Sequence, residues 1–429
     1  MTWSQFIFMS GARWRNPSLM KQYHSLKQTE KYSLEQLADF QSARLMEFLT
    51  HSANNSPYHR DYFISQGWTP GDPVTLDDFH KMPVMEKDIL IGQNHAIHAH
   101  GISEKLFFCE TSGTSGAILT FRRNELWDSF NRASIMRGYS WHGVNPWDRN
   151  IYFWGYNYGF RKRMISLIND RLLNRIRIFQ YDEPALRKLL KNLKEVVYIE
   201  GYSSMIYELA CMAEYSEFDC GKLKMIKGTS EKIYDHYSDK TRSIFGHKII
   251  SEYGAAETGI IAFECRYGNM HINMEGVYVE TDESNEIIVT NMMSYSFPVI
   301  RYRLGDAVKI RQNNQICGCG LNHPVIEEVT GRVGKNIYGI SGKYPSLVLY
   351  YIFKSIYFDK GVAINYQAHQ NVKGNLEIWT KEQPDDQLSS LILEYCFKYF
   401  GEDMNIKIWG GKKFIFEKGK LKDFISSVS

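Results

Sequence analysis

The chain has 429 residues, of which 44% are hydrophobic and 23% charged, and it contains 32 glycines but only 11 prolines. This composition is typical of a globular enzyme and excludes a disordered, collagen-like or coiled-coil chain. At about 150 residues per domain, the length predicts two or three structural units with a large buried core. The 51 basic and 48 acidic side chains leave a net charge of +3, too small to indicate nucleic acid as a partner.

No run of about eighteen apolar residues is present, so we expect no membrane span. The first apolar cluster, Phe6 to Met9, is short and has no basic residue ahead of it, unlike a secretion signal. We therefore expect a cytoplasmic protein. In that compartment the seven cysteines are reduced thiols or metal ligands rather than a disulfide framework.

Residues 17–50 carry apolar side chains at helical spacing, such as Leu37, Phe40 and Leu45, and Ser33 is a candidate helix cap. Residues 70–87 are interrupted by proline and glycine and predict loops with short helices. From the strand candidate at 106–110 onward, short strand candidates alternate with helical stretches. This alternation predicts right-handed βαβ units and a mainly parallel sheet.

The pattern changes between residues 277 and 311, where β-rich segments joined by short polar turns predict antiparallel pairing. A glycine-dense connection near Gly331 is the best candidate for a domain boundary. We therefore predict an α/β fold. A large N-terminal body, residues 1–330, has mainly parallel sheets with helices and a β-rich subdomain, and residues 331–429 form a small, mobile α+β lid.

The strongest local signal follows the strand candidate at 106–110 and consists of Thr111, Ser112, Gly113, Thr114, Ser115 and Gly116. Its glycines allow a tight turn, so that backbone amides and hydroxyls can point at the oxygens of a phosphate. The segment lacks the lysine of a Walker A motif. Taken alone, such a loop is more often a plain turn.

A second signal is the segment from Ser251 to Gly259, in which Glu257 could hold Mg²⁺ against phosphate oxygens or could simply be solvated at a helix cap. A third is Arg301 to Asp306, where the carboxylate of Asp306 could accept ribose hydroxyls or belong to an ordinary hairpin. The pairs Gly331-Arg332 and Gly419-Lys420 are weak signals by themselves.

The order and separation of these five segments resemble the adenylate-forming superfamily of acyl-CoA synthetases. The similarity is strongest to the phenylacetate–CoA ligase branch and its members from capsule and lipopolysaccharide gene clusters, and it spans roughly residues 35 to 425. The segments 56–63, 82–90 and 228–233 also match features of that branch.

The resemblance implies a role for each matching residue. The loop Thr111–Gly116 would bind ATP phosphates, Gly228 and Glu231 would border the adenine, and Tyr253, followed by Gly254, would stack on it. Glu257 would take the Mg²⁺-associated acidic role, Asp306 would bind the ribose hydroxyls, and Arg332 would contact ribose or phosphate. The C-terminal Lys420 would stabilise the negative charge that develops when a carboxylate attacks the α-phosphate.

Four positions depart from the family pattern. Ala256 replaces the usual Thr or Ser before the glutamate, although Thr258 could partly substitute. No lysine closes the phosphate loop, so Arg122 or Arg123 would have to supply positive charge. The segment after Arg332 lacks the common acidic residue, and Leu304 replaces a threonine.

A separate signal predicts a metal site. Cys265, His271, Cys317 and Cys319 offer three thiolates and one imidazole, which is the ligand set of a closed structural Zn²⁺ site. Members of the branch carry a similar cluster, and buried free cysteines are the alternative. The aromatic segment 152–160 falls where the branch places part of its carboxylate pocket, so that Tyr156, Asn157, Tyr158 and Gly159 are candidate lining residues.

The sequence thus indicates an ATP- and Mg²⁺-dependent carboxylate ligase that forms an acyl-AMP and transfers the acyl group to an acceptor. CoA is the default acceptor by resemblance. One alternative is an amine acceptor, such as an amino sugar or amino acid in surface-polysaccharide assembly, and a carrier protein is another possible acceptor. A further alternative, motivated by Ala256 and the missing loop lysine, is an inactive nucleotide-binding scaffold. No oligomeric state is indicated.

Overall fold

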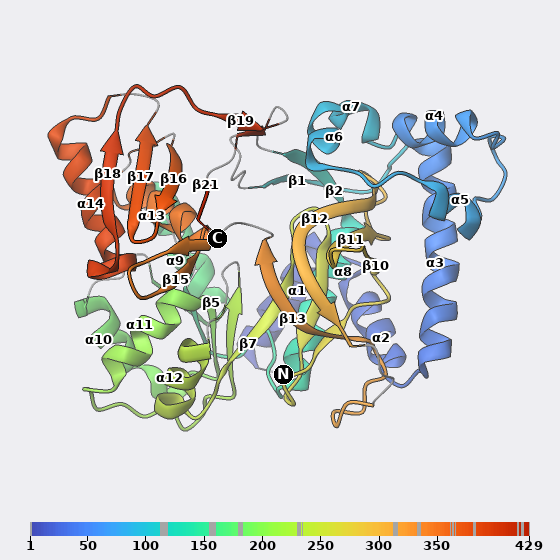
Figure 1. Cartoon of the computed structure of the whole chain (residues 1–429). Coiled ribbons are helices and arrows are strands. Elements are labelled where there is room, and N and C mark those ends of the chain that lie inside the picture. The colour runs from blue at the N-terminus through green and yellow to red at the C-terminus, as the bar shows by residue number, and fades with distance from the viewer. Residues whose placement is uncertain are drawn as a thin grey trace. The chain divides into compact units, whose positions relative to one another are not determined.

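The structure is a computed structural model of the 429-residue chain. It describes residues 2–111, 119–153, 160–178, 183–229, 233, 235–311, 316–332, 336–360, 362, 364, 366–380, 383–417, 420–421 and 424–428. The chain divides into two compact units (Figure 1): one comprises Met1–Thr111 and Thr120–Thr330, and the other contains Gly331–Ser429.

The first unit begins with seven helices: α1 (Trp3–Arg15), α2 (Leu19–Thr29), α3 (Leu34–Asn55), α4 (Pro57–Ser65), α5 (Leu76–Lys81), α6 (Lys87–Gly92) and α7 (Asn94–Ile97). Helix α3 starts where the sequence predicts. Ser33 and Gln36 form a capping box, in which each side chain bonds the backbone N–H of the other residue. Leu37 and Leu45, which we expected on a helical face, are fully buried along α3.

Strands β1 (Leu106–Glu110) and β2 (Thr120–Asn124) pair antiparallel in a sheet of their own. The prediction that the strand at 106–110 belongs to the βαβ series is therefore wrong. The next described element after β1 is therefore a second strand and not a helix, and the predicted phosphate loop falls between the two strands in the sequence.

In the described part of the first unit, one sheet of eleven strands has the order β10-β11-β12-β13-β9-β8-β7-β6-β5-β3-β4. Its strands are β3 (Asn150–Phe153), β4 (Arg175–Arg177), β5 (Tyr198–Tyr202), β6 (Met225–Thr229), β7 (Ile249–Ala255), β8 (Gly259–Glu264), β9 (Met270–Ile272), β10 (Val277–Thr281), β11 (Glu286–Asn291), β12 (Val299–Ile310) and β13 (Val325–Arg332). Strands β3 to β7 are parallel, and the pairs β7–β8, β8–β9, β9–β13, β10–β11 and β11–β12 are antiparallel. The predicted parallel and antiparallel parts thus continue in one sheet.

The parallel half is covered on both faces. On one face lie α10 (Glu183–Leu190), α11 (Ser203–Ala213) and α12 (Asp235–Phe245), grouped together in Figure 1 and sharing a core with the strand residues Ile151, Ile199 and Ile226. The other face packs against α8 (Glu125–Trp141), where Tyr139 contacts Tyr198. Successive side chains of a strand point to opposite faces of the sheet, so alternate residues of these strands belong to the two cores. The unit also contains α9 (Phe160–Leu172) and the short 3₁₀ helix η1 (Leu193–Glu195).

The second unit is built around a four-stranded sheet in the order β18-β17-β16-β21. Its elements are β14 (Asn336–Tyr338), β15 (Lys343–Pro345), α13 (Leu347–Lys360), β16 (Tyr366–Val372), β17 (Asn375–Thr380), α14 (Asp386–Phe400), η2 (Gly401–Asp403), β18 (Asn405–Trp409), β19 (Phe416–Glu417), β20 (Lys420–Leu421) and β21 (Phe424–Ser426). A separate apolar core joins Ile352, Ile378 and Ile392. Among the residues that the structure describes, no helix has both the length and the apolar character to cross a membrane.

Candidate functional site

The turn between β7 and β8 carries the second predicted motif. Tyr253 and Gly254 lie near the end of β7, and Glu257 follows in the turn. A Cβ atom on Gly254 would lie 2.2 Å from the carbonyl oxygen of Gly259, so only glycine fits this close approach between the two strands. Thr258 stabilises the turn, because its Oγ1 accepts a hydrogen bond from the N–H of Ala255 at 3.1 Å.

Glu257 is buried and its surroundings fix its position. Its Oε1 accepts a hydrogen bond of 3.2 Å from the phenol of Tyr302 on β12, and its backbone carbonyl accepts one of 3.1 Å from the amide of Asn291 on β11. With 6% of its surface exposed, the side chain is not the solvated cap considered as the alternative. One carboxylate oxygen of this buried side chain accepts a hydrogen bond from a phenol. Such a carboxylate is a suitable ligand for a hard cation such as Mg²⁺.

Asp306 and Tyr253 meet across the sheet. The phenol of Tyr253 donates a hydrogen bond of 2.9 Å to Oδ2 of Asp306, which lies on β12. Burial and the charge of Asp306 raise the pKa of Tyr253 far above its usual range, so the phenol stays protonated and remains a donor. The structure thus joins two motifs predicted to contact the base and the ribose of one nucleotide.

The hairpin next to the predicted phosphate loop brings a cation to the same turn. The guanidinium of Arg123 on β2 donates a bond of 3.1 Å to the carbonyl of Ala256 and pairs with Asp128 at 3.3 Å. The Arg122 side chain is exposed. Within the described residues, Oγ1 of Thr111 and Nε of Arg123 are buried and have no hydrogen-bond partner. Buried polar atoms of this kind are usually satisfied, so both could serve a ligand.

Buried charges lie just below the carboxyl ends of the parallel strands, and our sequence analysis missed them. Lys227 on β6 precedes the predicted adenine-bordering Gly228, and its Nζ contacts Glu252 at 2.8 Å and Glu200 at 3.2 Å. Burial opposes the charge of Lys227, but the two glutamates outweigh it and raise the lysine pKa. A lysine inside the apolar strand 225–229 was the available signal, because a lysine is rarely buried without partners.

The remaining predicted residues fall in two groups. Ser112, Gly113, Thr114, Ser115, Gly116, Tyr156, Asn157, Tyr158, Gly159 and Glu231 lie outside the described residues. Arg332 is the last residue of β13, and Lys420 is the first of β20, which pairs antiparallel with β19. For these two residues the structure gives the backbone element.

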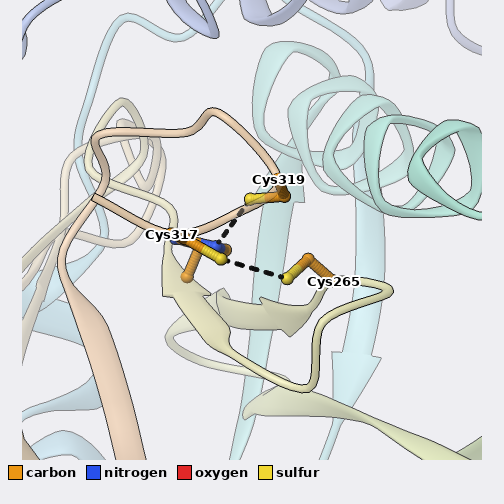
Figure 2. A group of neighbouring side chains, drawn as sticks. Cys265, Cys317 and Cys319 are labelled. Carbon is orange, nitrogen blue, oxygen red and sulfur yellow. Dashed lines mark hydrogen bonds between the residues drawn. The ribbon is translucent and has the colours of Figure 1, made fainter. Parts of the chain in front are cut away.

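The four predicted metal ligands come together. Cys265 follows β8, His271 lies on β9, and Cys317 and Cys319 lie between β12 and β13. Their ligand atoms all lie within 4.8 Å of one another. The thiols of Cys265 and Cys317 are 3.7 Å apart, and Cys319 Sγ is 3.2 Å from His271 Nε2. Figure 2 shows that the three thiols of Cys265, Cys317 and Cys319 point toward one another.

Two tight contacts orient these ligands. The Nδ1 of His271 lies 3.0 Å from the carbonyl oxygen of His323, which can only accept, so Nδ1 carries the proton and Nε2 presents its lone pair to the thiols. Burial lowers the pKa of His271 to about 4, which keeps the imidazole neutral. The Cys317 turn closes through a 2.9 Å bond from the N–H of Gly320, whose φ of +88° favours glycine.

A buried ion-pair network lies behind this cluster. Glu275 accepts hydrogen bonds from Arg137 of α8 at 2.6 Å and contacts Nε2 of His323 at 3.0 Å. Burial disfavours the carboxylate, but Arg137 and His323 outweigh it and hold the pKa of Glu275 well below its usual range. The network fixes the backbone of His323 and therefore the carbonyl that orients His271.

Comparison with known proteins supports the predicted fold. No protein-family model matches the chain. Protein CapK of Staphylococcus aureus is 21% identical over 394 residues, covering 86% of this chain and 84% of that protein.

Two solved structures of 2-hydroxyisobutyryl-CoA ligase are similar. One, in the postadenylation state with R3-HIB-AMP, has a TM-score of 0.60 at 15% identity and covers 94% of this chain and 92% of that chain. The other, with 2-HIB-AMP and CoA in the thioesterification state, has a TM-score of 0.58 at 17% identity and covers 93% and 91%. The chain therefore shares the fold of 2-hydroxyisobutyryl-CoA ligase, and the predicted α/β fold is confirmed.

Proposed function

We propose that the protein is an ATP-dependent carboxylate ligase that forms an acyl-adenylate and pyrophosphate. The observation that carries this proposal is the hydrogen bond between Tyr253 on β7 and Asp306 on β12, which joins the two predicted nucleotide motifs. Nucleotides bind at the carboxyl ends of parallel strands in open α/β sheets, and Tyr253 lies near the end of β7. The fold shared with 2-hydroxyisobutyryl-CoA ligase gives further support.

In this proposal each group has a physical task. Tyr253 stacks on the adenine, which Gly228 and Glu231 border, and Asp306 accepts the ribose hydroxyls. Glu257 holds Mg²⁺ against the phosphates of ATP, which the loop Thr111–Gly116 binds together with Arg332. Lys420 stabilises the charge on the α-phosphate. The substrate carboxylate is itself the nucleophile, so the protein supplies orientation and charge stabilisation and needs no nucleophile of its own.

We assign residues 1–330 to adenylation and residues 331–429 to a lid that carries Lys420 and moves between the two half-reactions. Tyr156, Asn157, Tyr158 and Gly159 line the carboxylate pocket in this proposal. CoA is the acceptor that we favour, because the similar ligase is recorded with 2-HIB-AMP and CoA bound. Transfer to an amine, in surface-polysaccharide assembly, is the competing acceptor class.

The decisive experiment is carboxylate-dependent exchange of labelled pyrophosphate into ATP, without any acceptor, across aromatic, fatty, hydroxy and amino acids. Exchange with one class would establish adenylation and identify the acid. Adding CoA or an amino sugar to the active mixture then identifies the acceptor. Silence across the panel, together with measurable ATP binding, would contradict the proposal and favour an inactive nucleotide-binding protein.

We further propose that Cys265, His271, Cys317 and Cys319 hold a structural Zn²⁺. Ligand atoms of a tetrahedral zinc site with bonds of 2.3 Å to sulfur lie about 3.8 Å apart. The 3.7 Å between Cys265 and Cys317 agrees with that separation. Burial raises the pKa of Cys319 to about 12, and a divalent cation would compensate the charge of the thiolates that burial disfavours. Four protein ligands leave no open position, so the role is structural.

A further inference from the structure

The first helix of the chain turns aromatic side chains outward. On α1, Trp3, Phe6 and Trp14 are 74%, 52% and 80% exposed. They share one face of the helix with Arg13, which is also exposed, because positions i, i+3, i+10 and i+11 lie within about a quarter to a third of a turn. None of the thirteen residues of α1 is buried. The outward face is therefore the more aromatic one.

The inner face of this helix, which includes Ile7, Phe8 and Ala12, is only half-buried. A helix of this length is marginal in water unless one face is buried. The described contacts that secure it involve its inner face and its C-terminal end. Arg15 pairs with Asp128 at 3.6 Å and lies 4.2 Å from the centre of the Phe107 ring. Asn16 donates a hydrogen bond of 2.9 Å to Asp128, and the rings of Phe8 and Trp147 lie 5.5 Å apart. The exposed aromatic face thus requires an explanation other than folding of the unit.

The charged side chains in this part of the sequence, and the one described charge that contacts the aromatic face, are basic. Residues 2–29 contain no aspartate or glutamate but include Arg13, Arg15, Lys21 and Lys27. The ammonium of Lys105, from the segment before β1, lies 4.5 Å from the centre of the Trp14 ring. An aromatic face bordered by cations and without nearby acids in the same stretch of chain is complementary to an anionic surface.

We propose that α1 binds the headgroup region of an anionic lipid bilayer and inserts Trp3, Phe6 and Trp14 at the boundary of the acyl chains. Tryptophan prefers the membrane interface, and basic amphipathic helices bind there through apolar burial and attraction to anionic lipids. Thirteen residues give a helix of about 20 Å, which lies on a bilayer and does not span it. A second copy would place this cationic face against an identical cationic face, whereas an anionic surface complements it. This inference goes beyond the proposed ligase activity and does not depend on it.

Sedimentation with vesicles tests the proposal. The full chain is mixed with vesicles of phosphatidylcholine alone or with 30% phosphatidylglycerol. We expect binding to the anionic vesicles and at least tenfold weaker binding of the triple variant Trp3→Ser, Phe6→Ser, Trp14→Ser. At 50 mM NaCl, Arg13→Glu should bind the anionic vesicles at least about fivefold more weakly than the wild type does. Added salt should weaken binding of the wild type.

The matched control is Phe397→Ser, because Phe397 is an exposed aromatic residue, 60% accessible, on α14 of the other unit. It should bind vesicles as the wild type does. Because α1 buries no residue, the triple variant should keep the wild-type thermal unfolding curve. Equal binding to both vesicle types, no binding to the anionic ones, or undiminished binding of the triple variant would overturn the proposal. If the wild type is a dimer and the triple variant is a monomer, the proposal would also be overturned. The aromatic face would then bind a second copy of the chain.

Discussion

The phenol of Tyr253 donates a hydrogen bond to Oδ2 of Asp306 across 2.9 Å and so connects two motifs that lie 53 residues apart in the chain. Three strands, β8, β9 and β13, lie between β7 and β12 in the order of the sheet, so this bond joins strands that are not neighbours. A protonated phenol holds one carboxylate oxygen in place, and this preorganises Asp306 for the ribose contact that we propose.

Removing the phenol should weaken nucleotide binding. For Tyr253→Phe we expect a rise of about threefold to tenfold in the KM for ATP in pyrophosphate exchange, because a typical hydrogen bond contributes about 0.5–1.5 kcal/mol. Asp306→Ala should lower kcat/KM by about a hundredfold or more, because it removes the proposed ribose acceptor. Tyr278→Phe, on β10 of the same sheet, is the control and should behave as the wild type. A normal KM in both site variants would contradict the assignment.

The main features of the fold could be predicted because they rest on local patterns. The capping residues at Ser33 and the alternation of strands and helices after residue 125 are sequence signals that act within a few residues. The hairpin of β1 and β2 could not be predicted in the same way. Nothing in the segment 106–110 shows whether its partner strand is parallel and distant or antiparallel and next in the chain.

In the candidate site, too, local features could be predicted from the sequence and non-local contacts could not. Motif order identified Tyr253 and Asp306 as candidates, but their direct hydrogen bond depends on sheet order, which is a non-local property. The partners of Lys227 were hidden for the same reason, since Glu200 and Glu252 lie on the two neighbouring strands. Arg123 was named only as a possible source of charge. Its bond to the carbonyl of Ala256 emerges from the structure.

Disrupting the cysteine–histidine cluster should remove the metal and lower stability, with little effect on chemistry. For Cys319→Ser we expect metal analysis to fall from about one zinc per chain to well below that, and Tm to fall by about 5–10 °C. Cys220→Ser, outside the cluster, should retain both. Undetectable zinc in the wild-type protein, purified without chelators, would contradict the zinc proposal.

The buried ion triad should be sensitive to removal of its cation. Lys227→Met leaves Glu200 and Glu252 without the ammonium between them, and we expect the free energy of unfolding to fall by about 3–5 kcal/mol in urea denaturation. The control is Lys222→Met, which breaks an exposed pair with Glu195 at 2.5 Å and should cost about 1 kcal/mol or less. If the two variants lose similar free energies of unfolding, burial does not determine how much this triad contributes to stability.

A buried histidine should make the protein sensitive to acid. His59 on α4 is fully buried, its Nδ1 lies 2.9 Å from Ser56 Oγ, and burial lowers its pKa to about 3. Because the folded protein disfavours the charged ring, its contribution to stability is complete above the ordinary histidine pKa of about 6.5 and is lost as the pH falls toward 3.

His59→Leu removes this proton linkage. The slope of unfolding free energy against pH between about 6 and 4 should become shallower by up to about 1.4 kcal/mol per pH unit. His95→Leu, at an exposed ring, should leave the slope unchanged. Parallel pH profiles for the wild type and His59→Leu would refute the assignment.

Lys420 provides a test that separates the two half-reactions. If its ammonium stabilises the charge on the α-phosphate during adenylation, Lys420→Ala should slow pyrophosphate exchange by about a hundredfold to a thousandfold. Transfer of the acyl group from a supplied acyl-AMP to the acceptor should stay within about threefold of the wild-type rate, because that step does not need the same charge at the α-phosphate. Lys413→Ala, an exposed lysine of the same unit, serves as the control for both assays. Equal loss of the two steps would mean that Lys420 supports the structure of the unit and not adenylation, and the proposed movement of residues 331–429 would lose its basis.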